Sequence, residues 1–262
     1  MSKKEREILR SLEVLEEKKR SENSPELIIR KYSLGQKKIL HLGILHWYYN
    51  KGMDFSKILK EIKYFEPDCV IFEMENKDCE DMKKMNPEER KYWFGENGII
   101  FSELDGSISV FGSDINHEDE ASLKEIEGKF SEEEIQAYKI YTRFPSIFLN
   151  GNLNPIESLK ESAKSLNLEF GKRIEKIIRN YVKRYLKKDL ENIKMGDDLS
   201  ICPYYLDNPL SLIAKNSNFF REEEMVSNCL DMMKNYKRIV IINGRNHVIR
   251  QEAFWKFKER VF

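Results

Sequence analysis

Two histidines of this sequence follow a glycine at the same spacing and after similar apolar runs. Gly43-x-x-His46 and Gly244-x-x-His247 each come after a run made mainly of Ile, Leu and Val. Apolar runs without alternation are typical of strands that helices cover on both faces. In open α/β sheets, ligands bind beyond the carboxyl ends of such strands. Since the chain contains 4 histidines, the shared pattern predicts that His46 and His247 belong to one site.

Carboxylates follow two further apolar runs. Glu73 and Glu75 come after residues 70–72, and Asp114 comes after residues 110–112. Two imidazoles and a carboxylate that leave coordination positions open form a hydrolytic metal site, because the metal acidifies its bound water and an open position admits a substrate carbonyl. Zinc, manganese and cobalt all suit such ligands. We therefore expect a divalent metal ion held by His46, Glu73, Asp114 and His247.

Each of these residues also has an ordinary interpretation. Glu73, Glu75 and Asp114 also fit solvated positions at strand ends, and Asp114 also fits the cap of a following helix. Arg221 begins a charge-rich helical stretch, where arginine is usually exposed; inside the site it would clamp a carboxylate or a developing oxyanion. Of the other histidines, His41 is expected to form a hydrogen bond in the core, and His117 lies in a polar stretch.

The remaining pattern indicates the elements that would position this site. Strands are expected near 39–45, 69–74, 108–113 and 238–243, and the hydrophobic period is helical from Asp119 to about residue 195. The sequence therefore predicts an α/β domain with a central mixed sheet, flanked by helices and interrupted by an α-helical insertion. Its expected parts are an N-terminal amphipathic helix (1–24), a first part of the α/β core (25–118), the insertion (119–215) and a second part of the core (216–262).

Composition excludes several classes of partner. Lys and Arg total 45, as do Asp and Glu, so no net charge favours nucleic acid. No apolar run is long enough to cross a bilayer, and the N-terminus lacks the apolar stretch of a signal peptide. The 4 cysteines have no metal-ligand spacing, which indicates reduced thiols. We expect a cytoplasmic protein that acts on a small-molecule or peptide substrate.

The order of the motifs resembles the TraB/Tiki-type superfamily, which also includes heme-binding ChaN-like proteins and, more distantly, the erythromycin esterases. The matching motifs are Gly43-x-x-His46, Pro67-Asp68-x-Val70-x-x-Glu73, Val110-x-Gly112-x-Asp114, Arg221-x-x-x-Met225 and Gly244-x-x-His247. The resemblance covers about 37–114 and 219–260, and it implies an EreA/ChaN-like α/β fold. It departs from the usual Gly-Thr-x-His form at Ile44, and it has Arg245 and Asn246 where small residues are common.

For function, the resemblance implies metal-dependent peptide hydrolysis at His46, His247, Glu73 and Arg221. Glu73 matches the glutamate of the family, so it would be the ligand or the primary base. Glu75 would assist from nearer solvent, because residues two apart in a regular strand point to the same face. Two alternatives stay open. One is a metal-free esterase-like hydrolase in which histidine activates water beside a glutamate, and the other is a non-catalytic protein that binds heme or a peptide.

Overall fold

The computed structural model describes residues 1–12, 19–20, 23–44, 55–115, 126, 128–151, 153–197, 199, 201, 203, 205 and 207–261. The chain forms two compact units. Residues 1–116 and 221–262 make an α/β unit, and residues 117–220 make a helical unit. The sequence placed the limits of the insertion at 119 and 215. The second limit of the helical unit lies within one long helix, α10 (Pro209–Met232).

The α/β unit contains a five-stranded mixed sheet with the order β1-β2-β5-β3-β4. The strands are β1 (Leu27–Leu34), β2 (Lys37–Ile44), β3 (Cys69–Phe72), β4 (Ser109–Gly112) and β5 (Arg238–Gly244). β2, β5, β3 and β4 are parallel, and β1 is antiparallel to β2. The prediction that residues 239–242 lie in the same sheet as residues 39–44 is confirmed, since Ile39 pairs with Ile239 and Leu42 with Ile242.

Strand β1 was not predicted. It forms a hairpin with β2, in which Leu34 pairs with Lys37 and Gly35-Gln36 make the turn. Gly35 has a φ of 58°, a conformation that glycine adopts without steric cost and that two-residue hairpins require. The apolar residues of β1 surround the charged Arg30-Lys31 pair, so the strand lacks the continuous apolar run that marks its neighbours.

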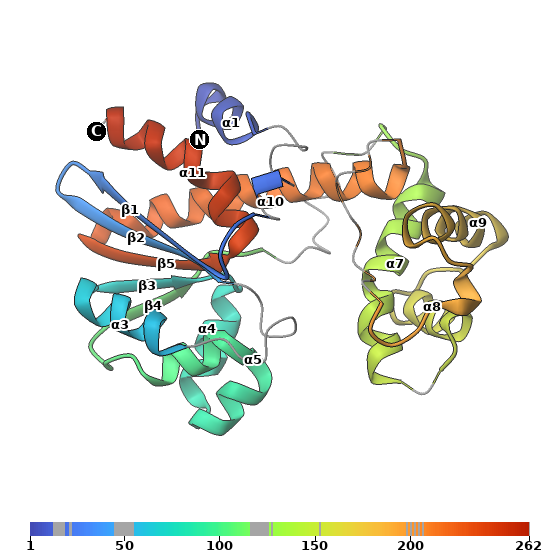
Figure 1. Ribbon diagram of the computed structural model, residues 1–262, viewed down its shortest axis with the longest axis horizontal. Coiled ribbons are helices and arrows are strands. Elements are labelled where there is room, and N and C mark those ends of the chain that lie inside the picture. Colours follow the sequence, from blue (N-terminus) through green and yellow to red (C-terminus); the bar gives the residue numbers. More distant parts are fainter. Residues whose placement is uncertain are drawn as a thin grey trace. The chain divides into compact units, whose positions relative to one another are not determined.

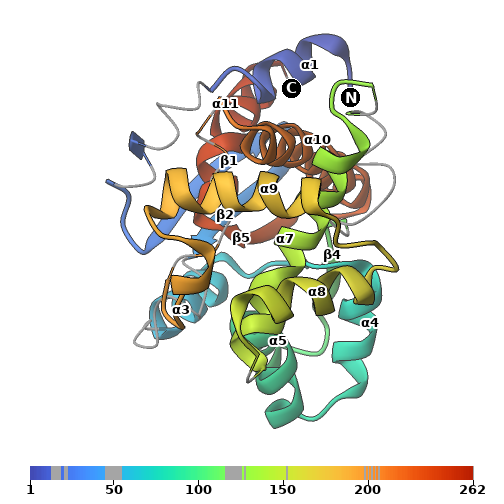
Figure 2. The ribbon, with the colours of Figure 1, turned by 90° about the vertical axis from the view of Figure 1, so that its right-hand side faces the viewer.

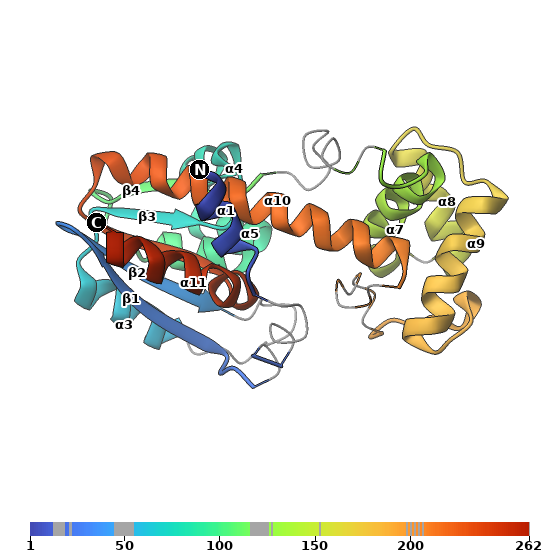
Figure 3. The same cartoon turned by 90° about the horizontal axis from the view of Figure 1, so that it is seen from above.

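Helices cover both faces of the sheet (Figure 1). One face carries α3 (Phe55–Phe65), α4 (Asn76–Lys84) and α5 (Pro87–Ser102), and the other carries α1 (Lys3–Leu9), the second half of α10, and α11 (Arg245–Val261). Figure 3 shows α11 lying over the sheet. Val240 and Ile242 pack against α3, α4 and α5, and Ile239 and Ile241 pack against α1, α10 and α11. Residues that alternate between two covered faces explain why the β5 sequence is continuously apolar.

The helical unit, whose helices Figure 2 shows, has its own hydrophobic core. Its helices are α7 (Glu132–Asn150), α8 (Pro155–Ser165) and α9 (Lys172–Tyr181), followed by a π-helical turn, Val182–Leu186, and a 3₁₀ turn, Leu190–Asn192. Ser131 and Asn154 begin α7 and α8 with reciprocal capping bonds to the glutamates three residues later. Among the helices that the structure describes, none is long and apolar enough to cross a membrane.

Candidate active site

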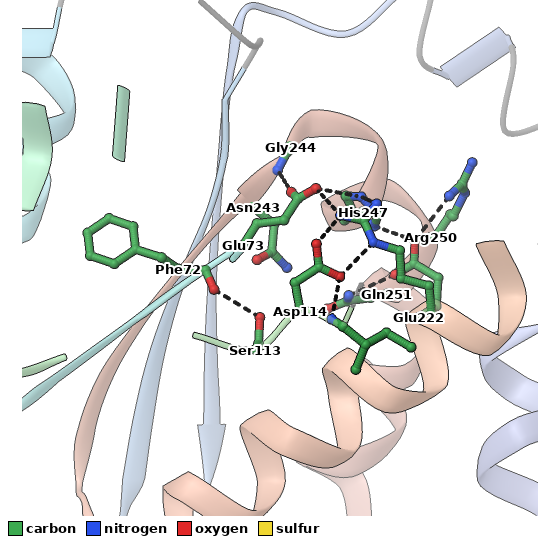
Figure 4. Close-up of polar contacts among 12 residues, drawn as sticks. Phe72, Glu73, Ser113, Asp114, Glu222, Asn243, Gly244, His247, Arg250 and Gln251 are labelled. Atoms are coloured by element: carbon green, nitrogen blue, oxygen red, sulfur yellow. Dashed lines mark hydrogen bonds and ion pairs between the residues drawn. The ribbon is translucent and has the colours of Figure 1, made fainter. Parts of the chain in front are cut away.

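The carboxyl ends of β3, β4 and β5 bring Glu73, Asp114 and His247 together (Figure 4). Helix α10 adds Arg221, which pairs with both acids. These are four of the six predicted site residues, and the other two are His46 and Glu75. His46 lies outside the described residues, as does His117. Glu75 is the N-cap residue of α4, after β3 has ended at Phe72. Glu73 and Glu75 therefore do not share one face of a regular strand, and that prediction is wrong.

Short backbone contacts after β3 and β4 position the two acids. Ser113 and Met74 both donate their N–H groups to the Phe72 carbonyl, at 2.9 and 3.0 Å. Asp114 then donates its N–H to the Met74 carbonyl at 3.0 Å. This close approach requires a glycine at 112, because a Cβ there would overlap the backbone of Met74 and Glu75. The sheet register and one glycine thus hold Asp114 beside Glu73.

Arg221 lies at the centre of the cluster. Its Nε donates to Asp114 Oδ1 at 2.6 Å, and one terminal nitrogen, Nη2, contacts Asp114 Oδ2 and lies 2.8 Å from Glu73 Oε1. The side chain is largely buried. A bidentate pair with additional hydrogen bonds is the geometry in which a buried arginine is best compensated. Arg221 is therefore not an exposed helix residue but clamps two carboxylates, as one of its two interpretations predicted.

Glu73 contacts three polar groups. Its Oε2 accepts from the Gly244 N–H, at the junction of β5 and α11. Its Oε1 lies 2.8 Å from Arg221 and 3.0 Å from His247 Nε2. Both oxygens of Glu73 therefore face donor groups, an arrangement that suits a carboxylate.

A second carboxylate, Glu222, holds the other side of His247. Its Oε1 lies 2.5 Å from His247 Nδ1 and 3.1 Å from a terminal nitrogen of Arg250, and its Oε2 accepts from Gln251 Nε2 at 2.8 Å. Glu222 is 1% exposed. Sequence reasoning missed this residue. The available signal was that His247, Arg250 and Gln251 recur at helical spacing, so they share one face of α11.

The two carboxylates determine the charge of His247. Burial by itself lowers the pKa of this imidazole, but Glu222 and Glu73 outweigh burial and raise the pKa to about 9. His247 is therefore an imidazolium at neutral pH, with Nδ1–H donating to Glu222 Oε1 and Nε2 paired with Glu73 Oε1 at 3.0 Å. Arg221 Nη1 lies 3.0 Å from His247 Nε2. The guanidinium is then a second cation, which contacts the same carboxylate of Glu73. Burial raises the pKa of Glu222, yet His247 and Arg250 lower it to about 2.

The charges of the cluster balance only when His247 is protonated. Glu73, Asp114 and Glu222 carry negative charge, whereas Arg221 and Arg250 carry positive charge. The imidazolium supplies the missing positive charge. A buried group of ions is stable only if its members are paired, so loss of the His247 proton leaves one carboxylate undercompensated.

The described residues do not by themselves fit a metal ion. In the part of the chain that the structure describes, no group of three or more His, Cys, Asp or Glu side chains is placed to hold one. The Arg221 guanidinium contacts Glu73, Asp114 and His247, the three described members of the predicted ligand set. A metal site would also need His46, and metal binding remains a prediction.

Glu73 also lines a pocket of about 560 Å³. Met74 contributes to the same wall, and the rest of the lining comes from residues 88–99 of α5. A substrate in this pocket would therefore reach the carboxylate that Arg221 and His247 hold.

The other predicted polar residues of the core have structural roles. His41 is fully buried in β2, with Nε2 3.3 Å from the side-chain nitrogen of Asn243, and burial lowers its pKa to about 3. Cys69 lies in β3, and Cys69, Cys79 and Cys229 are free and buried. Burial raises the pKa of each of these thiols to about 12, which makes them unreactive.

Comparison of the chain with family models, curated proteins and solved structures found no match. The resemblance to the TraB/Tiki-type superfamily therefore remains a prediction from the motifs.

Proposed function

We propose that this protein is a hydrolase of ester or peptide bonds, related to the TraB/Tiki-type superfamily, and that it acts without a metal ion in the manner of the erythromycin esterases. One observation carries the proposal: the pocket-lining carboxylate of Glu73 is held by a guanidinium and an imidazolium. Both cations contact Glu73 Oε1, and the Gly244 N–H occupies Oε2, so each carboxylate oxygen through which a metal ion would bind already has a partner.

In the proposed reaction, His46 takes a proton from the attacking water, as the esterase resemblance implies. Glu73 accepts a hydrogen bond from that water and orients it. The water oxygen bonds to the substrate carbonyl carbon, and the negative charge that develops on the carbonyl oxygen is stabilised by Arg221 and His247. The leaving group then departs with the proton that His46 returns. Fixed cations in a buried site need little reorganisation during this step.

The test is turnover of a panel of nitrophenyl esters and dipeptide amides by chelator-treated protein. Glu73→Gln should lower kcat by about 100-fold or more, whereas Glu75→Gln, at the start of α4, should keep most of the activity. Activity that is lost on chelation and restored by zinc, manganese or cobalt would instead establish the metal-dependent hydrolase. Absence of turnover with every member of the panel would favour a binding protein.

A further inference from the structure

Helix α5 is interrupted beside the candidate site. Gly95 has a φ of 52° and a ψ of −125°, which is not helical. A Cβ at Gly95 would meet no atom within 4 Å, so glycine is required there for its conformation and not for space. Three residues later, a Cβ at Gly98 would overlap the backbone of Arg90. The two halves of α5 are thus folded closely against each other at the pocket.

Two large aromatic side chains remain exposed at this break. Tyr92 is 79% exposed and Trp93 is 67% exposed, and their rings make an edge contact with centroids 5.0 Å apart. Both line the pocket, together with the partly buried Phe94. Exposed apolar surface next to a pocket is a mark of a binding site. Aromatic rings in this arrangement offer faces and edges to a further ring.

The charge of the pocket restricts its ligand. Among the described residues that line it, Glu73, Glu88 and Glu96 are carboxylates and Lys91 is a cation. Like charges across an interface disfavour association. An anionic group is therefore a poor ligand, whereas a neutral or cationic group is acceptable.

We infer that the pocket binds an aromatic or similarly planar apolar group of the substrate, neutral or cationic, with Trp93 and Tyr92 as the residues that determine specificity. The volume of about 560 Å³ lies within the usual range for small-molecule sites and accommodates an aromatic amino-acid residue with its flanking amides. The position of the scissile carbonyl beside Glu73 rests on the proposed function. The preference for the aromatic group rests on the pocket alone.

The experiment measures binding by calorimetry with three probes: N-acetylphenylalanine amide, N-acetylalanine amide and the anionic N-acetylphenylalanine. The phenylalanine amide should bind roughly tenfold more tightly than the other two, and Trp93→Ala should remove roughly that factor. Tyr64→Ala is the matched control, because Tyr64 is 82% exposed on α3 and does not line the pocket. Thermal unfolding of each variant confirms that it is folded.

Binding and turnover distinguish the inferred ligand preference from the proposed hydrolysis. Equal binding of the phenylalanine and alanine amides, or equal loss in the Trp93 and Tyr64 variants, would overturn the inference even if esters are hydrolysed. Trp93-dependent binding of the phenylalanine amide without hydrolysis of its ester would support the inference and overturn the proposed function. Hydrolysis of phenylalanine esters with a KM that rises in Trp93→Ala, and with kcat little changed, would support both.

Discussion

The charge state of His247 depends on Glu222, and Glu222→Gln tests this dependence. The substitution keeps the shape of the side chain and removes the charge 2.5 Å from His247 Nδ1. An opposite charge at such distances shifts a pKa by about 1–3 units. Burial and Arg221, which both lower the pKa of His247, remain in the variant. We therefore expect the pKa of His247 to fall from about 9 toward or below its ordinary value.

The stability of the folded protein should follow this pKa. In the native protein the folded pKa of about 9 exceeds the ordinary 6.5, so the bound proton stabilises the folded state. This stabilisation is complete below pH 6.5 and is lost as the pH rises through about 9. At about 1.36 kcal/mol per pKa unit, the difference corresponds to about 3 kcal/mol. In Glu222→Gln this loss should shrink by about 1–3 kcal/mol.

The assay is urea unfolding at about pH 6 and pH 9.5, together with an NMR titration of the histidine ring protons. The thiols Cys69, Cys79 and Cys229 also destabilise the folded state above pH 9, because burial raises their pKa values. They do so equally in both proteins, so the difference between the proteins isolates His247. Glu224→Gln, two positions along α10, is the control. If His247 of the native protein titrates near pH 6.5, or if both variants behave alike, the assigned imidazolium is wrong.

Three further substitutions should change stability, as measured by urea unfolding. Arg221→Met leaves Glu73 and Asp114 buried without their guanidinium, which should cost about 3–5 kcal/mol; an equally stable variant would show that the charges are solvated. Gly112→Ala should cost roughly 3 kcal/mol, because its Cβ overlaps the Met74 backbone, whereas Gly106→Ala, in open space, should be neutral. Asp68→Ala should cost about 1–2 kcal/mol, because Asp68 accepts the N–H groups of Lys237 and Arg238, at 2.9 and 3.0 Å; no loss would mean that water replaces it.

The sequence was sufficient for the parts of the fold that depend on local hydrophobic pattern. Continuous apolar runs identified β2, β3 and β5, and the matching Gly-x-x-His units indicated that β2 and β5 belong together. The end of the insertion was predicted at residue 215, which lies within α10, so the start of this helix was missed. The helix begins at Pro209, where Asn208 accepts the Leu210 N–H at 2.9 Å. That Asn-Pro pair is itself a helix-start signal, so this error was avoidable.

The charge partners of His247 could not be predicted from local pattern. Glu222 meets His247 only because α10 and α11 pack on the same face of the sheet, and no sequence spacing encodes the rotation of one helix against another. Arg221 was named as a site residue from the resemblance, because its charged sequence neighbours are by themselves typical of an exposed helix. Single-sequence reasoning identified the residue types of the site, but the pairing required the tertiary structure.

The strand order has a consequence for how the protein folds. The β1–β2 hairpin and the β3–β4 pair do not contact each other in the sheet, because β5 separates them. During synthesis β5 is made after the whole helical unit. The sheet therefore cannot be completed until β5 pairs with both β2 and β3. Pairings between strands so far apart in the sequence form slowly. Glu73 and Asp114 acquire His247 in the same event, so the cluster of these three residues cannot form before β5 fills the centre of the sheet.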